Sequence, residues 1–314
     1  MKEDRQPAGS HGAADRYYIA ATDQASRRIL VMDPAVDDWN EGQAEIWSWA
    51  PSGTNGFGRL LSAWGLPTDA KVYRSERWGG DWMVVTDSLG LAAIVPYPDG
   101  DSCKWGLSVG GNPHSAELLP NGNLAVAAST GGWVRVYASS QGPDAETFAE
   151  YAFPGAHGLV WDSRSRLLWA VGDHHLVSLS IEGSDSDPSI REIAKVPLPT
   201  PYGHDLQPVC GDDDRLWVSS GSRVYQFVLS TGMFLTDFPG SESASRQDVK
   251  TVGNQPSGQI VQTVPQAAGS LYEWTTDTVD FFQPDGKRLR EGAAFYKARI
   301  LLQKHWEKGD DQDE

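Results

Sequence analysis

The sequence predicts an all-β fold, a six-bladed β-propeller whose ring is closed by its C-terminal strand, on three observations. Pairs of short apolar runs with alternating character recur along the 314 residues, each pair joined by a tight polar turn. Six such hairpins occur, and no convincing helical period lies between them. The first hairpin has no strand before it, whereas the last apolar segment has no hairpin after it.

The hairpins supply the two middle strands of each blade, because a propeller blade has four strands. Each hairpin joins strands of about five to seven residues across a turn that contains Gly, Ser or Asp, which is typical of an antiparallel meander. The hairpins lie at residues 17–33, 82–97, 124–138, 167–181, 215–229 and 259–284.

An inner strand is expected just before each of the last five hairpins, at 71–75, 114–119, 157–162, 204–209 and 248–253. The chain enters the first hairpin directly at Tyr17, so that blade lacks its inner strand. The alternating segment 293–303 is therefore predicted to join the N-terminal blade and close the ring, which removes the exposed sheet edges.

We expect a single propeller domain over residues 16–305, with a disordered arm at 1–15 and an acidic disordered tail at 306–314. The net charge of −16 argues against non-specific binding of nucleic acid, which needs a basic face. The sequence has neither an apolar run of membrane-spanning length nor a secretory signal. We expect no membrane partner, a monomer, and a cytoplasmic location by default, although a secreted form whose leader has been removed would read the same way.

Three of the 7 histidines fall at equivalent places when the blades are aligned by their second strands. Counting back ten residues from the apolar run gives His114 and His157, and a slightly longer loop gives His204. The full set of register positions is Arg74, His114, His157, His204, Lys250 and Lys297, the last with Arg299 as its alternative. Because inner strands line the channel, these side chains should converge at its mouth, with no carboxylate in register.

Other polar side chains and one aromatic are expected at the same mouth: Asn112, Asp205, Gln247, Asp248 and Trp133. We assign the three histidines catalytic roles. Substrate binding is assigned to Arg74, Lys250, Lys297, Asn112, Trp133, Asp205 and Asp248. The alternative is a structural role, in which each histidine ring caps an inner strand or bonds a backbone carbonyl.

Two chemical uses of the cluster are open. In the first, His114, His157 and His204 bind a divalent metal such as Mn or Zn, with Gln247 or water completing the shell. In the second, no metal is present and one histidine acts as general base or acid while cationic side chains bind an anionic group. The sequence contains no Walker or Rossmann pattern, so no nucleotide cofactor is expected.

Both uses fit β-elimination from a uronic acid, in which a base removes the proton α to a carboxylate whose charge must be neutralised. The three-His-plus-Gln set resembles the metal site of oligogalacturonate lyases, which are seven-bladed propeller enzymes. The motifs G-N-P-H-S, A-H-G and G-H-D-L, which contain the three histidines, resemble those of a functionally uncharacterised bacterial and fungal propeller family. That second resemblance spans nearly the whole chain and implies the fold.

The sequence therefore predicts a lyase that acts on a uronic-acid-containing glycan or oligosaccharide, with a small anionic carbohydrate or another carboxylate-bearing ligand as partner. The main alternative is a propeller without turnover that binds a glycan or a protein. A hydrolase using the same pocket is a weaker alternative, because paired acidic residues are not evident. A calcium-dependent lactonase type is weaker still, because the register positions are rich in nitrogen.

Overall fold

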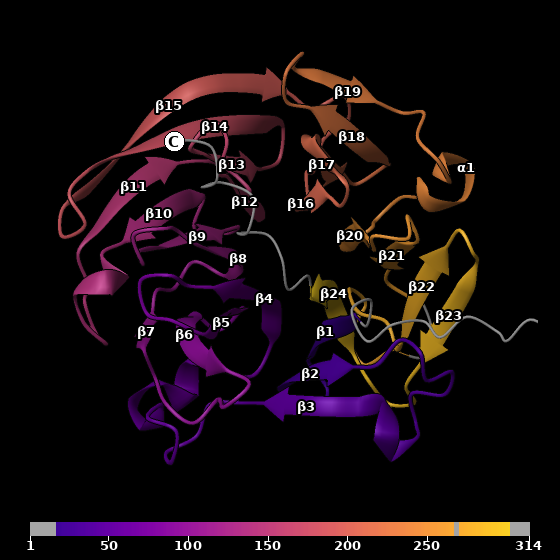
Figure 1. The fold of residues 1–314 in the computed structure, drawn as a ribbon, viewed down its shortest axis with the longest axis horizontal. Helices are drawn as coiled ribbons and strands as arrows, with labels where there is room; N and C mark the ends of the chain where they lie inside the picture. Colours follow the sequence, from indigo (N-terminus) through magenta and orange to yellow (C-terminus); the bar gives the residue numbers. More distant parts are fainter. Residues whose placement is uncertain (1–16, 267–269, 302–314) are drawn as a thin grey trace, which may run out of the picture.

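The computed structural model describes residues 17–266 and 270–301, which form six four-stranded antiparallel sheets around a central axis (Figure 1). This arrangement confirms the predicted six-bladed propeller. The predicted arm at 1–15 and tail at 306–314 lie outside the described residues. In the described part of the chain, no helix has the length and apolarity needed to cross a membrane.

Each blade runs from an inner strand at the channel to an outer strand at the rim. Blade one contains β24 (Phe295–Leu301), β1 (Tyr18–Asp23), β2 (Arg28–Met32) and β3 (Glu45–Trp49). Blade two contains β4 (Pro67–Arg74), β5 (Asp81–Asp87), β6 (Leu91–Tyr97) and β7 (Trp105–Ser108). Blade three contains β8 (Pro113–Leu118), β9 (Leu124–Ala128), β10 (Trp133–Tyr137) and β11 (Phe148–Ala152).

Blade four contains β12 (Gly158–Asp162), β13 (Leu167–Val171), β14 (His175–Gly183) and β15 (Pro188–Pro197). Blade five contains β16 (Asp205–Val209), β17 (Asp212–Ser219), β18 (Val224–Val228) and β19 (Met233–Leu235). Blade six contains β20 (Thr251–Asn254), β21 (Ile260–Thr263), β22 (Thr278–Phe282) and β23 (Gly286–Leu289). The helical pieces are short: 3₁₀ turns at Gly42–Ala44, Gly58–Ala63 and Ser139–Gln141, and α1 (Ser241–Ala244).

The ring is closed by the two ends of the chain, as predicted. β24 pairs antiparallel with β1, with Ile19 opposite Ile300 and Ala20 opposite Arg299. An unpaired β1 would leave a row of backbone N–H and C=O groups without partners at the centre of the molecule. The last strand supplies those partners and becomes the inner strand of blade one (Figure 1).

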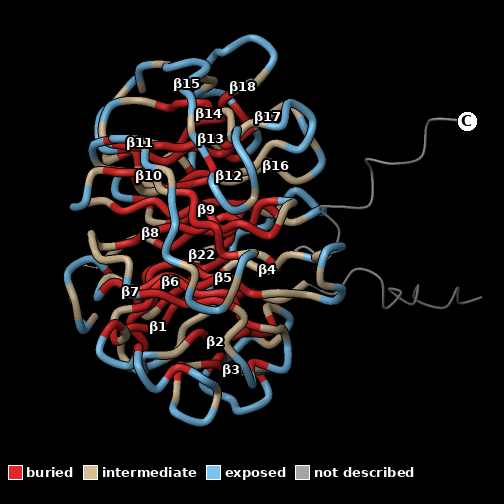
Figure 2. The backbone as a smooth tube through the Cα atoms, turned by 90° about the vertical axis from the view of Figure 1, so that its left-hand side faces the viewer, coloured by how far each residue is buried: buried red, intermediate tan, exposed pale blue. Residues whose placement is uncertain are grey.

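The core lies between neighbouring blades, where the faces of adjacent sheets pack together. In one such layer Ile19 and Leu30 of blade one pack with Val261 and Phe281 of blade six. The second strand of blade three, β9, is buried on both faces, since all of its residues are buried. The outer strands β11 and β15 are largely exposed, as are most turns (Figure 2). Burial on both sides explains why the middle strands read as almost continuous apolar runs.

Candidate active site at the channel mouth

Six side chains stand at the start of the six inner strands, and we call them the mouth ring: Thr68, His114, His157, His204, Lys250 and Tyr296. Thr68 and His114 are the bulged residues in the pairing of β4 with β5 and of β8 with β9. The backbone N–H groups of His157, His204 and Lys250 donate to the carbonyls of Val171, Ser219 and Thr263, just before regular pairing begins. Tyr296 lies in the bulge of β24.

The structure brings the three predicted histidines together. The ring centroids of His114 and His157 are 4.6 Å apart, and those of His157 and His204 are 4.5 Å apart. The Tyr296 ring lies 5.4 Å from His114 and 6.0 Å from His204. The four rings therefore form one aromatic cluster, with His157 between the other two histidines.

Two of the imidazoles are held in a defined tautomer. His114 Nδ1 lies 2.8 Å from the carbonyl oxygen of Asn112, and His157 Nδ1 lies 2.6 Å from that of Gly155. A carbonyl can only accept, so Nδ1 carries the proton in both rings and Nε2 carries a lone pair. Asn112 and Gly155 both adopt positive φ angles, 61° and 66°, and in each case the carbonyl two residues before the histidine reaches its ring.

The third histidine is bonded differently. Its Nε2 atom lies 2.9 Å from Lys250 Nζ, which has only hydrogens to donate, so His204 Nε2 is the acceptor. The proton is then on Nδ1, which is buried and has no hydrogen-bond partner among the described residues. Lys250 and His204 thus form a pair on one side of the mouth ring.

Burial keeps the cluster neutral near pH 7. Desolvation lowers the pKa of His157 to about 4. The hydrogen bond to the carbonyl of Gly155 opposes this shift, because it favours the charged form of the ring. Burial, followed by the proximity of His157, lowers the pKa of His114 and His204 well below the usual value. The pKa of Lys250 is also lowered by burial, and the nearby Asp248 carboxylate opposes this shift.

A second layer of side chains lies directly below the mouth ring, and we call it the charge layer: Asp69, Asp205, Lys297 and Arg299. Arg299 Nε lies 2.7 Å from Asp69 Oδ1, and Arg299 Nη1 lies 3.0 Å from Asp205 Oδ2. Lys297 Nζ lies 3.4 Å from Asp205 Oδ1 and donates to the carbonyl of His114 at 3.0 Å. None of the four is more than 2 % exposed, so each charge depends on the others.

The pKa values in this layer follow from that packing. Burial alone would raise the pKa of Asp69 and Asp205, but Arg299 and then Lys297 outweigh it and lower both. Burial lowers the pKa of Lys297 to about 8, although both carboxylates favour its charged form. The charge layer is therefore a compensated network of two carboxylates and two cations.

The structure corrects the predicted place of Arg74. This residue lies at the far end of β4, opposite Asp81, and its side chain is 60 % exposed. The count was wrong because β4 and β5 pair over a long stretch, from Pro67 opposite Asp87 to Arg74 opposite Asp81. The inner strand starts at Pro67, and Thr68 takes the expected place of Arg74.

Four further predicted binders have partners of their own. Lys297 and Asp205 lie in the charge layer, where Asp205 bonds both Lys297 and Arg299. The six positions of the mouth ring hold no carboxylate, but Asp69 and Asp205 each lie one residue further along the chain. Trp133 is 6 % exposed, packs in the core between blades two and three, and carries the guanidinium of Arg135 4.0 Å from its ring centroid. Asn112 donates from Nδ2 to Ser129 and supports His114 through its backbone.

The residues do not fit the predicted three-His metal site. Across 17–266 and 270–301, no group of three or more His, Cys, Asp or Glu side chains is placed to hold a metal ion. The Nε2 lone pair of His204 faces the ammonium of Lys250, where a cation would be repelled. Gln247 is exposed and lines a neighbouring pocket with Lys250.

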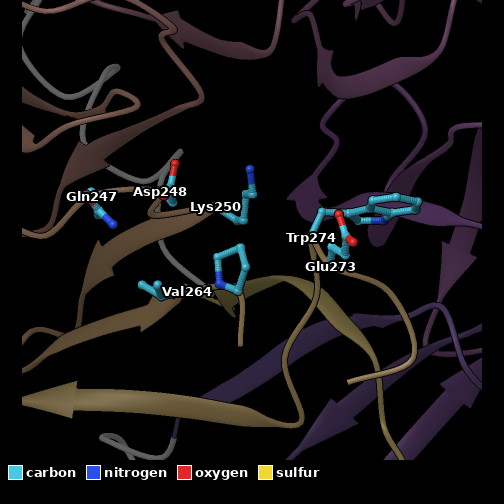
Figure 3. Close-up of a pocket in the computed structure, with 7 residues that line it drawn as sticks. Gln247, Asp248, Lys250, Val264, Glu273 and Trp274 are labelled. Atoms are coloured by element: carbon cyan, nitrogen blue, oxygen red, sulfur yellow. The ribbon is translucent and has the colours of Figure 1, made fainter. Parts of the chain in front are cut away.

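That pocket adjoins the mouth ring and has a volume of about 360 Å³. Its lining residues are Gln247, Asp248, Lys250, Val264, Pro265, Glu273 and Trp274. Figure 3 shows Gln247 and Asp248 on one side, Glu273 and Trp274 on the other, and Lys250 between them. Lys250 belongs to both the pocket and the mouth ring, so a ligand could touch both at once.

Sequence reasoning missed three residues of this region. Thr68 and Tyr296 depend on strand bulges, which the sequence does not display. Trp274 had a usable signal, because the run Leu-Tyr-Glu-Trp at 271–274 places aromatic residues outside any regular strand.

Comparison with known families identifies a match over residues 11–313 to a family described as "Family of unknown function (DUF6528)". The chain belongs to this family. No curated protein matches the chain.

Among solved structures, a protein of unknown function from Bacteroides caccae has a TM-score of 0.56 and 11% identity, covering 91% of this chain and 99% of that one. A streptogramin B lyase structure has a TM-score of 0.46 and 14% identity, covering 70% of this chain and 67% of the other. Dihydro-heme d1 dehydrogenase NirN has a TM-score of 0.47 and 11% identity, covering 97% and 59%. At these identities the first of them shows a shared fold.

Proposed function

We propose that this member of the DUF6528 family is a metal-independent lyase that performs β-elimination on a uronic-acid-containing glycan or oligosaccharide. One observation carries the proposal. His114 and His157 donate from Nδ1 to backbone carbonyls at 2.8 and 2.6 Å, which leaves two Nε2 lone pairs in a ring that also holds the Lys250 ammonium. A neutral base beside a cation is what proton removal next to a carboxylate requires.

His157 is the proposed base. It is the middle histidine of the cluster and is more exposed than His114, and its pKa of about 4 leaves it unprotonated at neutral pH. A substrate carboxylate beside the ring would raise the pKa of His157, because a negative charge favours the imidazolium. The base would thus become stronger when the substrate is bound.

The reaction moves one proton and breaks one carbon–oxygen bond. His157 Nε2 takes the proton from the carbon α to the carboxylate, and the C–H electron pair becomes the new carbon–carbon double bond. The bond from the β carbon to the glycosidic oxygen breaks, and that oxygen takes a proton from water. Lys250 neutralises the charge that develops on the carboxylate. Arg74 and Lys297 have no part in this step, because one lies at the far end of its strand and the other is buried.

A hydrolase finds less support in the same geometry. Asp69 and Asp205 are the carboxylates below the mouth ring, and both are buried against Arg299. Carboxylates in such a network cannot serve as the acid and base of a glycosidase. The remaining alternative is a propeller that binds a uronate without cleaving it.

The test is the appearance of the ultraviolet absorbance of unsaturated uronates when the protein is mixed with a panel of uronate oligosaccharides. His157→Gln should lower turnover by about 10²- to 10⁴-fold, because the base is lost, while the protein stays folded. His175→Gln, at the first residue of β14, is the control and should retain activity. Binding of uronates without any unsaturated product would establish the non-catalytic alternative.

A further inference from the structure

The pocket beside the mouth ring differs from it in charge. Two carboxylates, Asp248 and Glu273, line it and are exposed, and Lys250 is the one cation among its lining residues. Lys250 already donates to His204 at the mouth ring, where the proposed function places the uronate carboxylate. A second anionic group in the pocket would therefore face carboxylates without a cation of its own.

Trp274 gives the pocket an aromatic wall. Its side chain is 44 % exposed although the residue is large and apolar. The indole is held in place: Nε1 donates to Gln24 Oε1 at 2.9 Å, and the Tyr272 ring stacks on it at 5.1 Å with an interplanar angle of 3°. Tyr272 does not line the pocket, so its stacking orients Trp274 without closing the cavity.

This combination suits a sugar ring without charge. The C–H face of a pyranose packs on an aromatic ring, while its hydroxyl groups donate to carboxylate oxygens. The volume of about 360 Å³ lies within the range of small-molecule pockets, roughly 300–1,000 Å³. Glu273 stands next to Trp274 on one side, and Asp248 lies opposite (Figure 3).

We infer that the pocket is a subsite for a neutral sugar unit, with Trp274 as its stacking platform, so that the substrate carries a neutral sugar linked to the uronic acid. This inference rests on the proposed function for the place of the uronate at the mouth ring. Lys250 marks the boundary between the two subsites. Asp248 and Glu273 exclude a second uronate from the pocket.

The test measures binding by calorimetry with three probes: glucuronic acid, a disaccharide of a neutral hexose linked to O4 of glucuronic acid, and a disaccharide of two glucuronic acids. The wild-type protein should bind the mixed disaccharide about tenfold more tightly than either other probe. Trp274→Ala should remove this advantage and leave the affinity for glucuronic acid unchanged. Asp248→Asn combined with Glu273→Gln should improve binding of the di-uronide.

Leu271→Ala is the matched control, because Leu271 is 60 % exposed in the same loop and does not line the pocket. The subsite is overturned if Trp274→Ala binds the mixed disaccharide like the wild type, if the wild type prefers the di-uronide, or if no probe binds. Unsaturated product is recorded with the same disaccharides. If binding depends on Trp274 and no unsaturated product forms, the subsite is supported and the lyase is rejected. If product forms equally well in the wild type and in Trp274→Ala, the subsite alone is rejected.

Discussion

The mouth ring and the charge layer are built from adjacent residues of the same inner strands, yet their chemistry is opposite. His204 precedes Asp205, and Tyr296 precedes Lys297. The upper residue of each pair is uncharged and belongs to the aromatic cluster, whereas the lower one is charged and bound to a counter-charge. In the ring, two imidazoles retain Nε2 lone pairs, while the charge layer has its cations and carboxylates matched.

This difference separates a reactive surface from a structural one. Buried ions contribute little net stability as a set, but removal of one partner leaves an uncompensated charge. Neutral groups with lowered pKa values at a pocket are typical of a functional site. The charge layer also supports the ring, because Lys297 donates to the backbone carbonyl of His114.

The largest expected effect comes from breaking the charge layer. Arg299→Met should lower the free energy of unfolding by about 3–5 kcal/mol, because Asp69 and Asp205 would stay buried without their main partner. Urea denaturation measures the loss. The control Arg74→Ala, whose exposed side chain pairs loosely with Asp81 at 3.5 Å, should cost less than about 1 kcal/mol. Equal losses of unfolding free energy in Arg299→Met and Arg74→Ala would show that the charge layer does not stabilise the fold.

A smaller effect should appear in the pH dependence of the mouth ring. The pKa of His157 is about 4 in the folded protein and about 6.5 when free, so the unfolded chain binds more protons between these values. The stability contributed by neutral His157 is present above pH 6.5 and is lost as the pH falls toward 4. Relative to His157→Gln, the wild type should lose about 3 kcal/mol over this range.

The measurement is urea denaturation of both proteins at several pH values. The variant retains His114 and His204, whose pKa values are lowered mainly by burial. A difference between the two proteins that stays constant from pH 7 to pH 4 would contradict the burial of His157 as a neutral base.

The smallest effect concerns the residue that joins the ring to the pocket. Lys250→Met removes the ammonium that bonds His204 and should raise the KM or Kd for a uronate ligand about tenfold, with little change in stability. Lys104→Met is the control, because Lys104 lies over Trp78, in another part of the propeller. An unchanged affinity in Lys250→Met would remove Lys250 from the proposed carboxylate site.

Much of the fold could be predicted because its signals are local. Alternating or continuous apolar runs on both sides of a short turn predict hairpins such as 82–97 and 124–138. The closure by β24 was predictable because the first hairpin lacks an inner strand and the last apolar segment lacks a hairpin of its own. The register between neighbouring strands was harder to predict. It is fixed by the hydrogen-bonded pairs and the bulges, and the length of an apolar run does not reveal either.

In the candidate site, too, some residues were predictable from the repeat and others were not. His114, His157 and His204 fall one blade apart in sequence, and their convergence was predictable from the repeat. Arg74 failed the same count because β4 is longer than its apolar core suggests. Trp133 satisfied the positional rule, but its ring is enclosed by neighbouring blades.

The sequence by itself determined the six blades, the closure of the ring and the convergence of three histidines, because each depends on short-range patterns repeated at a regular interval. The tertiary structure decided the protonation and availability of the groups. The bulges place Tyr296 in the ring and Lys297 in the charge layer. Burial lowers the pKa of the imidazoles, and Lys250 donates to Nε2 of the third imidazole, His204. Arg299 pairs with carboxylates from β4 and β16, on other blades of the propeller. Such contacts join residues far apart in the chain, so no local pattern records them.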